Sequence, residues 1–129
     1  MSNNSLVIQA FFKHFDEFMK DILRVYPENK KYLKLKMYFE GLKKANPRIL
    51  IMAWKNMITE PYRAQIEAGD VDFFVEKDYT EDVDWVNKKH NADDSIAELR
   101  ASVRNMGGEN TEKAMKYVQN LSKIGDLYN

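Results

Sequence analysis

The chain has 129 residues, of which 44% are hydrophobic and 31% charged, and its 20 Lys and Arg balance 20 Asp and Glu. This length fits one domain, and the composition is that of a globular rather than a disordered protein. The lack of cysteine excludes disulfides and thiolate chemistry and is typical of a reducing, intracellular compartment. The first apolar run has no basic region before it and soon meets charged residues, so we expect neither a signal peptide nor a membrane span.

The balanced charge hides a difference between the two halves of the chain. Residues 1–69 carry 12 Lys and Arg against 7 Asp and Glu, a net +5, whereas residues 70–129 carry 8 against 13, a net −5. Such a difference either steers charged partners or lets the two halves of one fold attract each other. We favour attraction within the fold, because it requires no partner.

Apolar residues recur at helical spacing through nearly the whole chain, and no segment alternates as a strand does. An aromatic stripe over about residues 6–26 predicts an amphipathic first helix. Pro27 ends it, because a proline disfavours helical geometry at the residue before it. A second helix, at about 28–45, sets apolar residues on one face and is basic elsewhere. Its lysines are Lys30, Lys31, Lys34, Lys36, Lys43 and Lys44.

The segment 47–59 is expected to form the central, most buried helix. Its residues from Ile49 to Trp54 are apolar nearly all round, which is typical of a helix in the middle of a bundle. Pro61 would remove one backbone hydrogen bond, so we expect the helix to kink or break near this residue. One or two further turns then end at Gly69 in a left-handed conformation.

The acidic half continues with helical segments at about 70–79, 80–90, 93–106 and from 111 onward. We therefore predict an all-α protein, a compact bundle of about five to seven helices around the helix at 47–59. Residues 1–106 are expected to form a single helical domain. The hinge at Gly107-Gly108 then leads, over residues 107–129, to a C-terminal helix packed on the same domain, with docking on a partner as the alternative.

No pattern of residues indicates a catalytic, metal or cofactor site. His14 is followed one turn later by a carboxylate, but a shared metal would need a second such pair, and His90 lies in a polar segment. The acidic run from Asp70 to Asp84 begins like a calcium-binding loop, yet Phe74 and Val75 stand where a ligand and a glycine are required. There is neither a nucleophile elbow nor a phosphate-binding glycine loop. We therefore expect no enzyme activity, no bound metal and no cofactor.

Two surfaces are candidates for binding. Aromatic residues in the segment from Pro61 to Tyr79 favour a protein contact, because neighbouring phenylalanines cannot both face one direction on a helix and one is expected at a rim or under a partner. The candidate protein contacts are Tyr62, Phe73, Phe74 and Tyr79. The alternative is weak, sequence-independent binding of nucleic acid by the second helix. Its candidate contacts are Lys30, Lys31, Lys34, Lys43 and Lys44. Zero net charge and the lack of a nucleic-acid-binding motif disfavour this alternative.

A series of helix breaks, caps and aromatic residues is spread over residues 11–79. It consists of Val25-Tyr26-Pro27-Glu28, Pro47, Trp54-Lys55, Pro61-Tyr62, Ile66, Gly69-Asp70, Phe73-Phe74 and Asp78-Tyr79. This pattern resembles that of small helical proteins of large DNA viruses of algae and other protists. The resemblance implies a non-enzymatic viral protein that contacts viral or host proteins in the host cytoplasm, as a virion-associated or minor structural component. It implies no catalytic residues.

Overall fold

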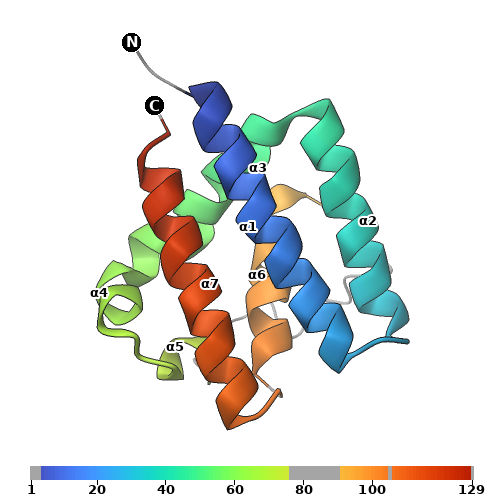
Figure 1. The fold of residues 1–129 in the computed structure, drawn as a ribbon, viewed down its shortest axis with the longest axis vertical. Coiled ribbons are helices and arrows are strands. Elements are labelled where there is room, and N and C mark those ends of the chain that lie inside the picture. The colour runs from blue at the N-terminus through green and yellow to red at the C-terminus, as the bar shows by residue number, and fades with distance from the viewer. Residues whose placement is uncertain (1–3, 76–90, 105, 129) are drawn as a thin grey trace.

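A computed structural model of the chain describes residues 4–75, 91–104 and 106–128. Every regular element in these ranges is helical, so the predicted all-α bundle is confirmed (Figure 1). The elements are α1 (Asn4–Val25), α2 (Lys30–Ala45), α3 (Pro47–Trp54), the π-helix η1 (Lys55–Thr59), α4 (Glu60–Ala68), α5 (Asp72–Val75), α6 (Ala92–Val103) and α7 (Gly108–Asp126). The helix predicted at 80–90 lies outside the described residues.

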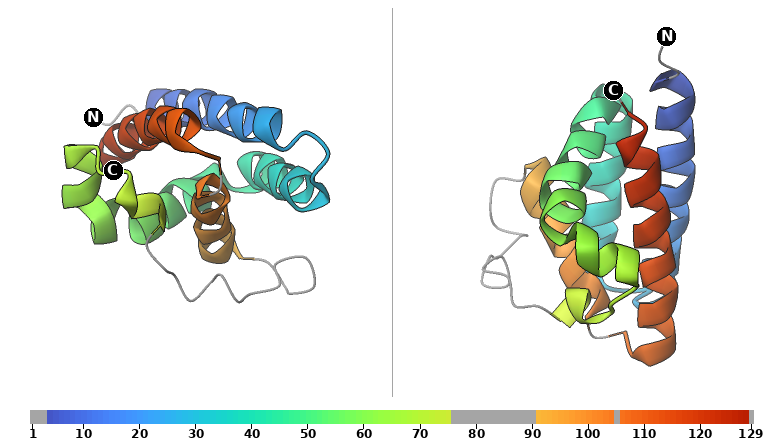
Figure 2. Two further views of the ribbon diagram at one scale, coloured as in Figure 1. Left: turned by 90° about the horizontal axis from the view of Figure 1, so that it is seen from below. Right: turned by 90° about the vertical axis from the view of Figure 1, so that its left-hand side faces the viewer.

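The helices α1 and α7 lie side by side, although they come from opposite ends of the chain (Figures 1 and 2). The aromatic residues of α1 recur at helical spacing and therefore share one face, which is buried here. Phe18 stacks on Tyr117 of α7 with the ring centroids 5.3 Å apart. Phe11 meets Trp54 of α3 edge to face, with the centroids 6.1 Å apart. The predicted aromatic face is thus the interface that joins both ends of the chain to the core.

The segment α3–η1–α4 runs through the bundle as the sequence predicts, with one difference. Leu50, Ile51 and Trp54 are buried, but Ile49 and Met52 are 44% and 38% exposed. The expectation that this helix is covered on all sides is therefore wrong for its first turns. An apolar run without a polar face lacks the periodicity that would have shown which side faces solvent.

The predicted kink near Pro61 is present and takes the form of a π-helix followed by a bend. The amide N–H of Glu60 bonds to the carbonyl of Lys55, five residues back, instead of four. Pro61 has no N–H to donate, and Tyr62 just beyond it has non-helical dihedral angles, φ −125° and ψ 21°. Gly69 ends α4 with φ 68°, the left-handed cap predicted for it.

The helix α6 begins at Ala92, one residue before the predicted segment at 93–106, and ends three residues before it, at Val103. Asn91 occupies the N-cap, and its side chain accepts a 2.7 Å hydrogen bond from the amide of Asp94. The helix is buried over most of its length and includes two buried charged residues, Glu98 and Arg100. Each of these charges is paired or hydrogen-bonded within the fold, as described below.

Candidate functional site

The helix α2 lies at the side of the bundle with one face inward. Asn29 caps its first turn, because its side chain accepts a hydrogen bond from the amide of Tyr32. Leu35 and Phe39, one turn apart, are fully buried and fix the orientation of the helix. The opposite side of α2, which we call the outer face, is exposed along its whole length. It consists of Lys30, Leu33, Lys34, Met37, Gly41 and Lys44.

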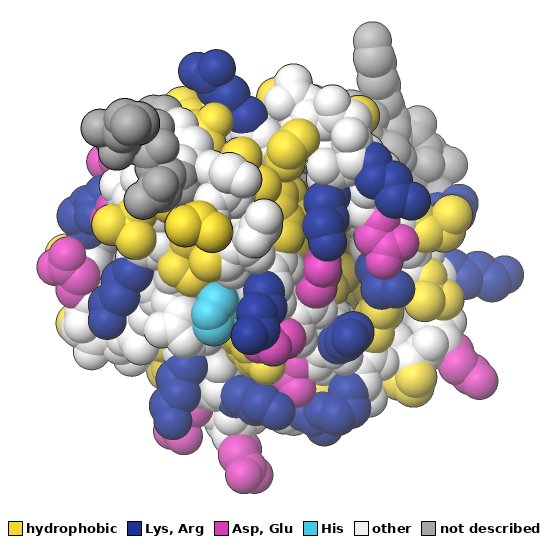
Figure 3. Space-filling view, turned by 45° about the horizontal axis from the view of Figure 1, so that its top comes forward, with side chains coloured by type: hydrophobic (Ala, Val, Ile, Leu, Met, Phe, Trp, Pro, Cys, Tyr) yellow, Lys and Arg dark blue, Asp and Glu magenta, His cyan; other side chains and the backbone are white. Residues whose placement is uncertain are grey.

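The outer face of α2 combines exposed apolar side chains with positive charge. Met37 is 69% exposed and Leu33, one turn before it, is 40% exposed. Lys30, Lys34 and Lys44 flank them and form no ion pair with any described residue. In Figure 3, hydrophobic side chains lie exposed between Lys and Arg on the right-hand side, where α2 is found in Figure 1.

The remaining lysines of α2 are held by acidic residues. Lys31 pairs with the buried carboxylate of Glu98 in α6. The ammonium of Lys43 lies 3.1 Å from Asp16 of α1 and 5.5 Å from the centroid of the Phe12 ring. The structure therefore divides the five lysines predicted as nucleic-acid contacts. Lys31 and Lys43 hold α2 to its neighbours, whereas Lys30, Lys34 and Lys44 are turned to solvent.

Among the described residues, ion pairs join the basic and acidic halves of the chain. They are Lys31–Glu98, Arg63–Asp126 and Lys113–Asp21. The first two place a cation of residues 1–69 on an anion of residues 70–129, in agreement with attraction inside one fold.

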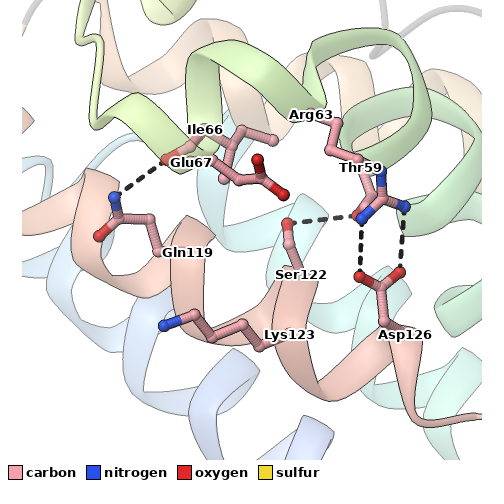
Figure 4. A pocket seen from close by; sticks show the side chains of 8 residues that line it. All are labelled: Thr59, Arg63, Ile66, Glu67, Gln119, Ser122, Lys123 and Asp126. Carbon is pink, nitrogen blue, oxygen red and sulfur yellow. Dashed lines mark hydrogen bonds and ion pairs between the residues drawn. The ribbon is translucent and has the colours of Figure 1, made fainter.

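A pocket of about 200 Å³ lies between η1, α4 and α7 (Figure 4). It is lined by Thr59, Arg63, Ile66, Glu67, Gln119, Ser122, Lys123 and Asp126. At one side, Arg63 donates to both carboxylate oxygens of Asp126, at 2.8 and 3.2 Å. This contact lowers the pKa of the Asp126 carboxyl and raises that of the Arg63 guanidinium. At the other side, the Gln119 amide donates a 2.9 Å hydrogen bond to the carbonyl of Ile66, near the end of α4.

The floor of this pocket is a small network of hydroxyl groups. Ser122 Oγ accepts hydrogen bonds from the Trp54 indole N–H and from the Thr59 hydroxyl, each 3.2 Å long. A nucleophilic serine needs a base that takes its proton, but both described partners of Ser122 are donors. The pocket is also smaller than the roughly 300–1,000 Å³ usual for ligand sites. These contacts therefore fasten α7 to α3, η1 and α4.

The predicted aromatic contact surface is largely inside the protein. Phe73 and Phe74 are 0% and 1% exposed, so the expectation that one of them lies at a rim is wrong. Their ring centroids lie 4.9 Å apart and both rings line one small cavity among α1, α3, α6 and α7, so the two neighbouring side chains are covered together. Tyr62 is only partly exposed, and Tyr79 lies outside the described residues.

Arg100 explains why this region is closed. Its guanidinium donates from Nε and Nη2 to the carbonyl of Phe73, at 3.1 and 3.0 Å, and from Nη1 to the Tyr62 hydroxyl at 3.1 Å. It also lies over both aromatic rings, 4.4 Å from the centroid of Tyr62 and 4.9 Å from that of Phe73. One buried cation thus joins α4, α5 and α6.

The histidines do not form a site in the described residues. His14 is partly exposed on α1, and His90 lies outside the described ranges. Among the residues that the structure describes, no group of three or more His, Asp or Glu is placed to hold a metal ion.

Sequence reasoning identified the basic helix but missed its most exposed apolar residue, Met37. The signal was present, because Lys30, Leu33, Lys34, Met37 and Lys44 share one face of a helix when residues are placed 100° apart. The role of Arg100 had no such signal, since its partners lie in other helices.

Neither a protein-family model, a curated protein sequence nor a solved structure matches this chain. None of the described helices combines the length and the hydrophobicity that crossing a bilayer would need.

Proposed function

We propose that this protein acts by binding another protein through the outer face of α2. The observation that carries the proposal is that Met37 and Leu33 are exposed one turn apart, between lysines that no described residue neutralises. Single exposed hydrophobic residues are common, but an adjacent pair within one charged face favours a contact site. Burial of such side chains contributes roughly 25 cal/mol per Å².

The partner is proposed to be a viral or host protein, on the strength of the resemblance of residues 11–79 to small proteins of large DNA viruses. The proposed contact surface is the outer face of α2. Phe73 and Phe74 are no longer proposed for this role, because their side chains are already covered by the chain itself. Nucleic acid is the competing partner, and Lys30, Lys34 and Lys44 favour it. Phosphate contacts would not, however, use the apolar side chains of Leu33 and Met37.

Site-specific crosslinking tests the proposal. Benzoylphenylalanine replaces Met37 in the full chain, and the same group replaces Lys116, an exposed residue of α7, as a matched control. The variants are irradiated in the cells that naturally contain the protein, and the products are identified by mass spectrometry. We expect one protein to crosslink from position 37 but not from position 116, with a lower yield when Lys34→Glu is added.

The crosslinked protein is then purified, and its binding to the unmodified chain is measured at low and moderate salt. Crosslinks to nucleic acid alone, or equal yields from both positions, would contradict the proposal. A gel shift of a 20-bp duplex that disappears at moderate salt, together with no protein crosslink, would favour nucleic acid instead.

A further inference from the structure

Gly41 lies on the outer face of α2 and has no packing neighbour among the described residues outside its own helix. Glycine in a helix interior is unfavourable relative to alanine, so such a glycine is usually explained by a positive φ or by close packing. Gly69 and Gly107 are the described glycines with positive φ, and Gly41 is not one of them. Apart from the backbone of α2 itself, no atom of the described residues lies within 4 Å of the place where a Cβ of Gly41 would be. The missing side chain therefore leaves open space on the outside of α2.

The position of this open space relative to the exposed apolar residues is regular. Leu33, Met37 and Gly41 follow one another at intervals of four residues, so they form one row along the helix. The side chains of Leu33 and Met37 project from this row, whereas Gly41 has no side chain and leaves a gap. Helices pack by placing such rows into the grooves of a neighbour, and small residues let the two backbones come closer.

The charge of the outer face indicates the charge of its partner. Lys30, Lys34 and Lys44 lie on this face, and one acidic residue, the exposed Glu40, lies at its edge beside Leu33. The nearest carboxylate on α2, that of Glu40, lies 3.1 Å from Lys36. A partner with carboxylates beside its apolar residues would neutralise the three lysines and exclude water from Leu33 and Met37.

We infer that the outer face of α2 binds an acidic amphipathic helix of the partner, which crosses α2 closely at Gly41. The inference rests on the proposed function and adds the chemistry of the partner. The partner helix carries apolar residues at positions i, i+3 or i+4, and i+7, with Asp or Glu at its flanks. The outer face spans the 15 residues from Lys30 to Lys44, a rise of about 21 Å along the helix, so roughly four turns of partner cover it.

A displayed library of helix-forming peptides about 18 residues long, near the length that makes an isolated helix stable, is the probe. Peptides are selected on the full chain, and their sites are mapped by amide chemical shifts. We expect the selected peptides to be acidic, to carry the apolar spacing above and to shift the amides of the outer face of α2. Selected peptides without an excess of Asp and Glu, or peptides mapped elsewhere, would overturn the inference.

Substitution of Gly41 gives the sharper readout. We expect Gly41→Leu to weaken peptide binding by roughly tenfold or more, as the loss of a close central contact does. Gly41→Ala should weaken it less while the melting temperature rises, because alanine is the better helix former. Gly108→Ala in α7, where a Cβ would also meet no atom within 4 Å, should leave binding unchanged. Unchanged peptide affinity in both Gly41 variants would overturn the inference.

Two further probes separate this inference from other occupants and from the proposed function. If a 20-bp DNA duplex, or vesicles containing phosphatidylserine, bind the same face with the same loss in Gly41→Leu, the peptide helix is not the specific occupant. If a protein crosslinks at position 37 but its affinity does not depend on Gly41, the proposed function stands and the acidic helix is overturned. If neither crosslinks nor α2-directed peptides are found, both are overturned.

Discussion

The α5–α6 region and the outer face of α2 hold their cations in opposite ways. Arg100 is buried, and its guanidinium is surrounded by the Phe73 carbonyl, the Tyr62 hydroxyl and two aromatic rings. Lys34, in contrast, is exposed and has no ion pair with a described residue. A cation with acceptors from several helices stabilises its own fold, whereas one without them is available to a partner. The net charge of the chain counts both kinds of cation equally and therefore does not distinguish them.

Replacing Arg100 with methionine should give the largest effect. The change removes the donors that the Phe73 carbonyl and the Tyr62 hydroxyl now use, while keeping a long apolar side chain. Buried acceptors left without donors are costly, so we expect the free energy of unfolding to fall by about 3 kcal/mol. Urea unfolding measures this. Lys34→Met is the control and should change stability by no more than about 0.5 kcal/mol. If Arg100→Met and Lys34→Met lowered the free energy of unfolding equally, the two cations would not differ in how they serve the fold.

Ser122→Ala tests whether a buried network without charge also stabilises the fold. The change leaves the Trp54 indole N–H without its acceptor, for which we expect a loss of about 1–2 kcal/mol in the free energy of unfolding. Asn120→Ala, at an exposed position of the same helix, should stay within about 0.5 kcal/mol. A loss no larger than that of the control would mean that water replaces the hydroxyl.

Replacing two glycines by alanine should change the free energy of unfolding in opposite directions, and this sharpens the comparison between the outer face of α2 and the packed interior. Gly41→Ala should raise the free energy of unfolding by about 0.5–1 kcal/mol, because no strain and no close contact opposes the added methyl group. Gly69→Ala should lower it by about 1 kcal/mol, since its φ of 68° suits glycine best. Thermal unfolding measures both. A loss of stability in Gly41→Ala would mean that the fold itself requires this glycine.

The exposed pair Arg63–Asp126 should have the smallest effect, visible mainly as a pH dependence. Arg63 holds the pKa of the Asp126 carboxyl below its ordinary value. The pair therefore stabilises the fold above the pKa that Asp126 has when unfolded, and this contribution is lost as the pH falls through the lower, folded value. Asp126→Asn should lose less stability than the wild type on acidification below about pH 4. Identical urea midpoints over that range would contradict this.

The sequence predicted the elements better than the surfaces. Apolar spacing identified α1 and α2, and the chemistry of proline and glycine placed the kink and the cap at Gly69. The same reasoning expected one of the neighbours Phe73 and Phe74 at a rim, because spacing along a single helix cannot show that both rings line one cavity closed by other helices. For α2, lysine spacing located a basic face, but only the packed structure separates Lys31 and Lys43, which hold neighbouring helices, from Lys34.

The π-helix makes the chain length within this segment matter. Between Lys55 and Glu60, one turn holds a residue more than an α-helix would accept. Five residues of a π-turn rotate the chain through about the same angle as four residues of an α-helix, so deleting one residue here should restore ordinary helical hydrogen bonding and leave the helix beyond it in nearly the same orientation. The same deletion in α3, which has no extra residue, would rotate everything after it by about 100°. Tyr62 would then turn away from Arg100, and Arg63 from Asp126. The loss of one residue should therefore be tolerated better at Lys55–Thr59 than in α3, a dependence on register that no individual side chain displays.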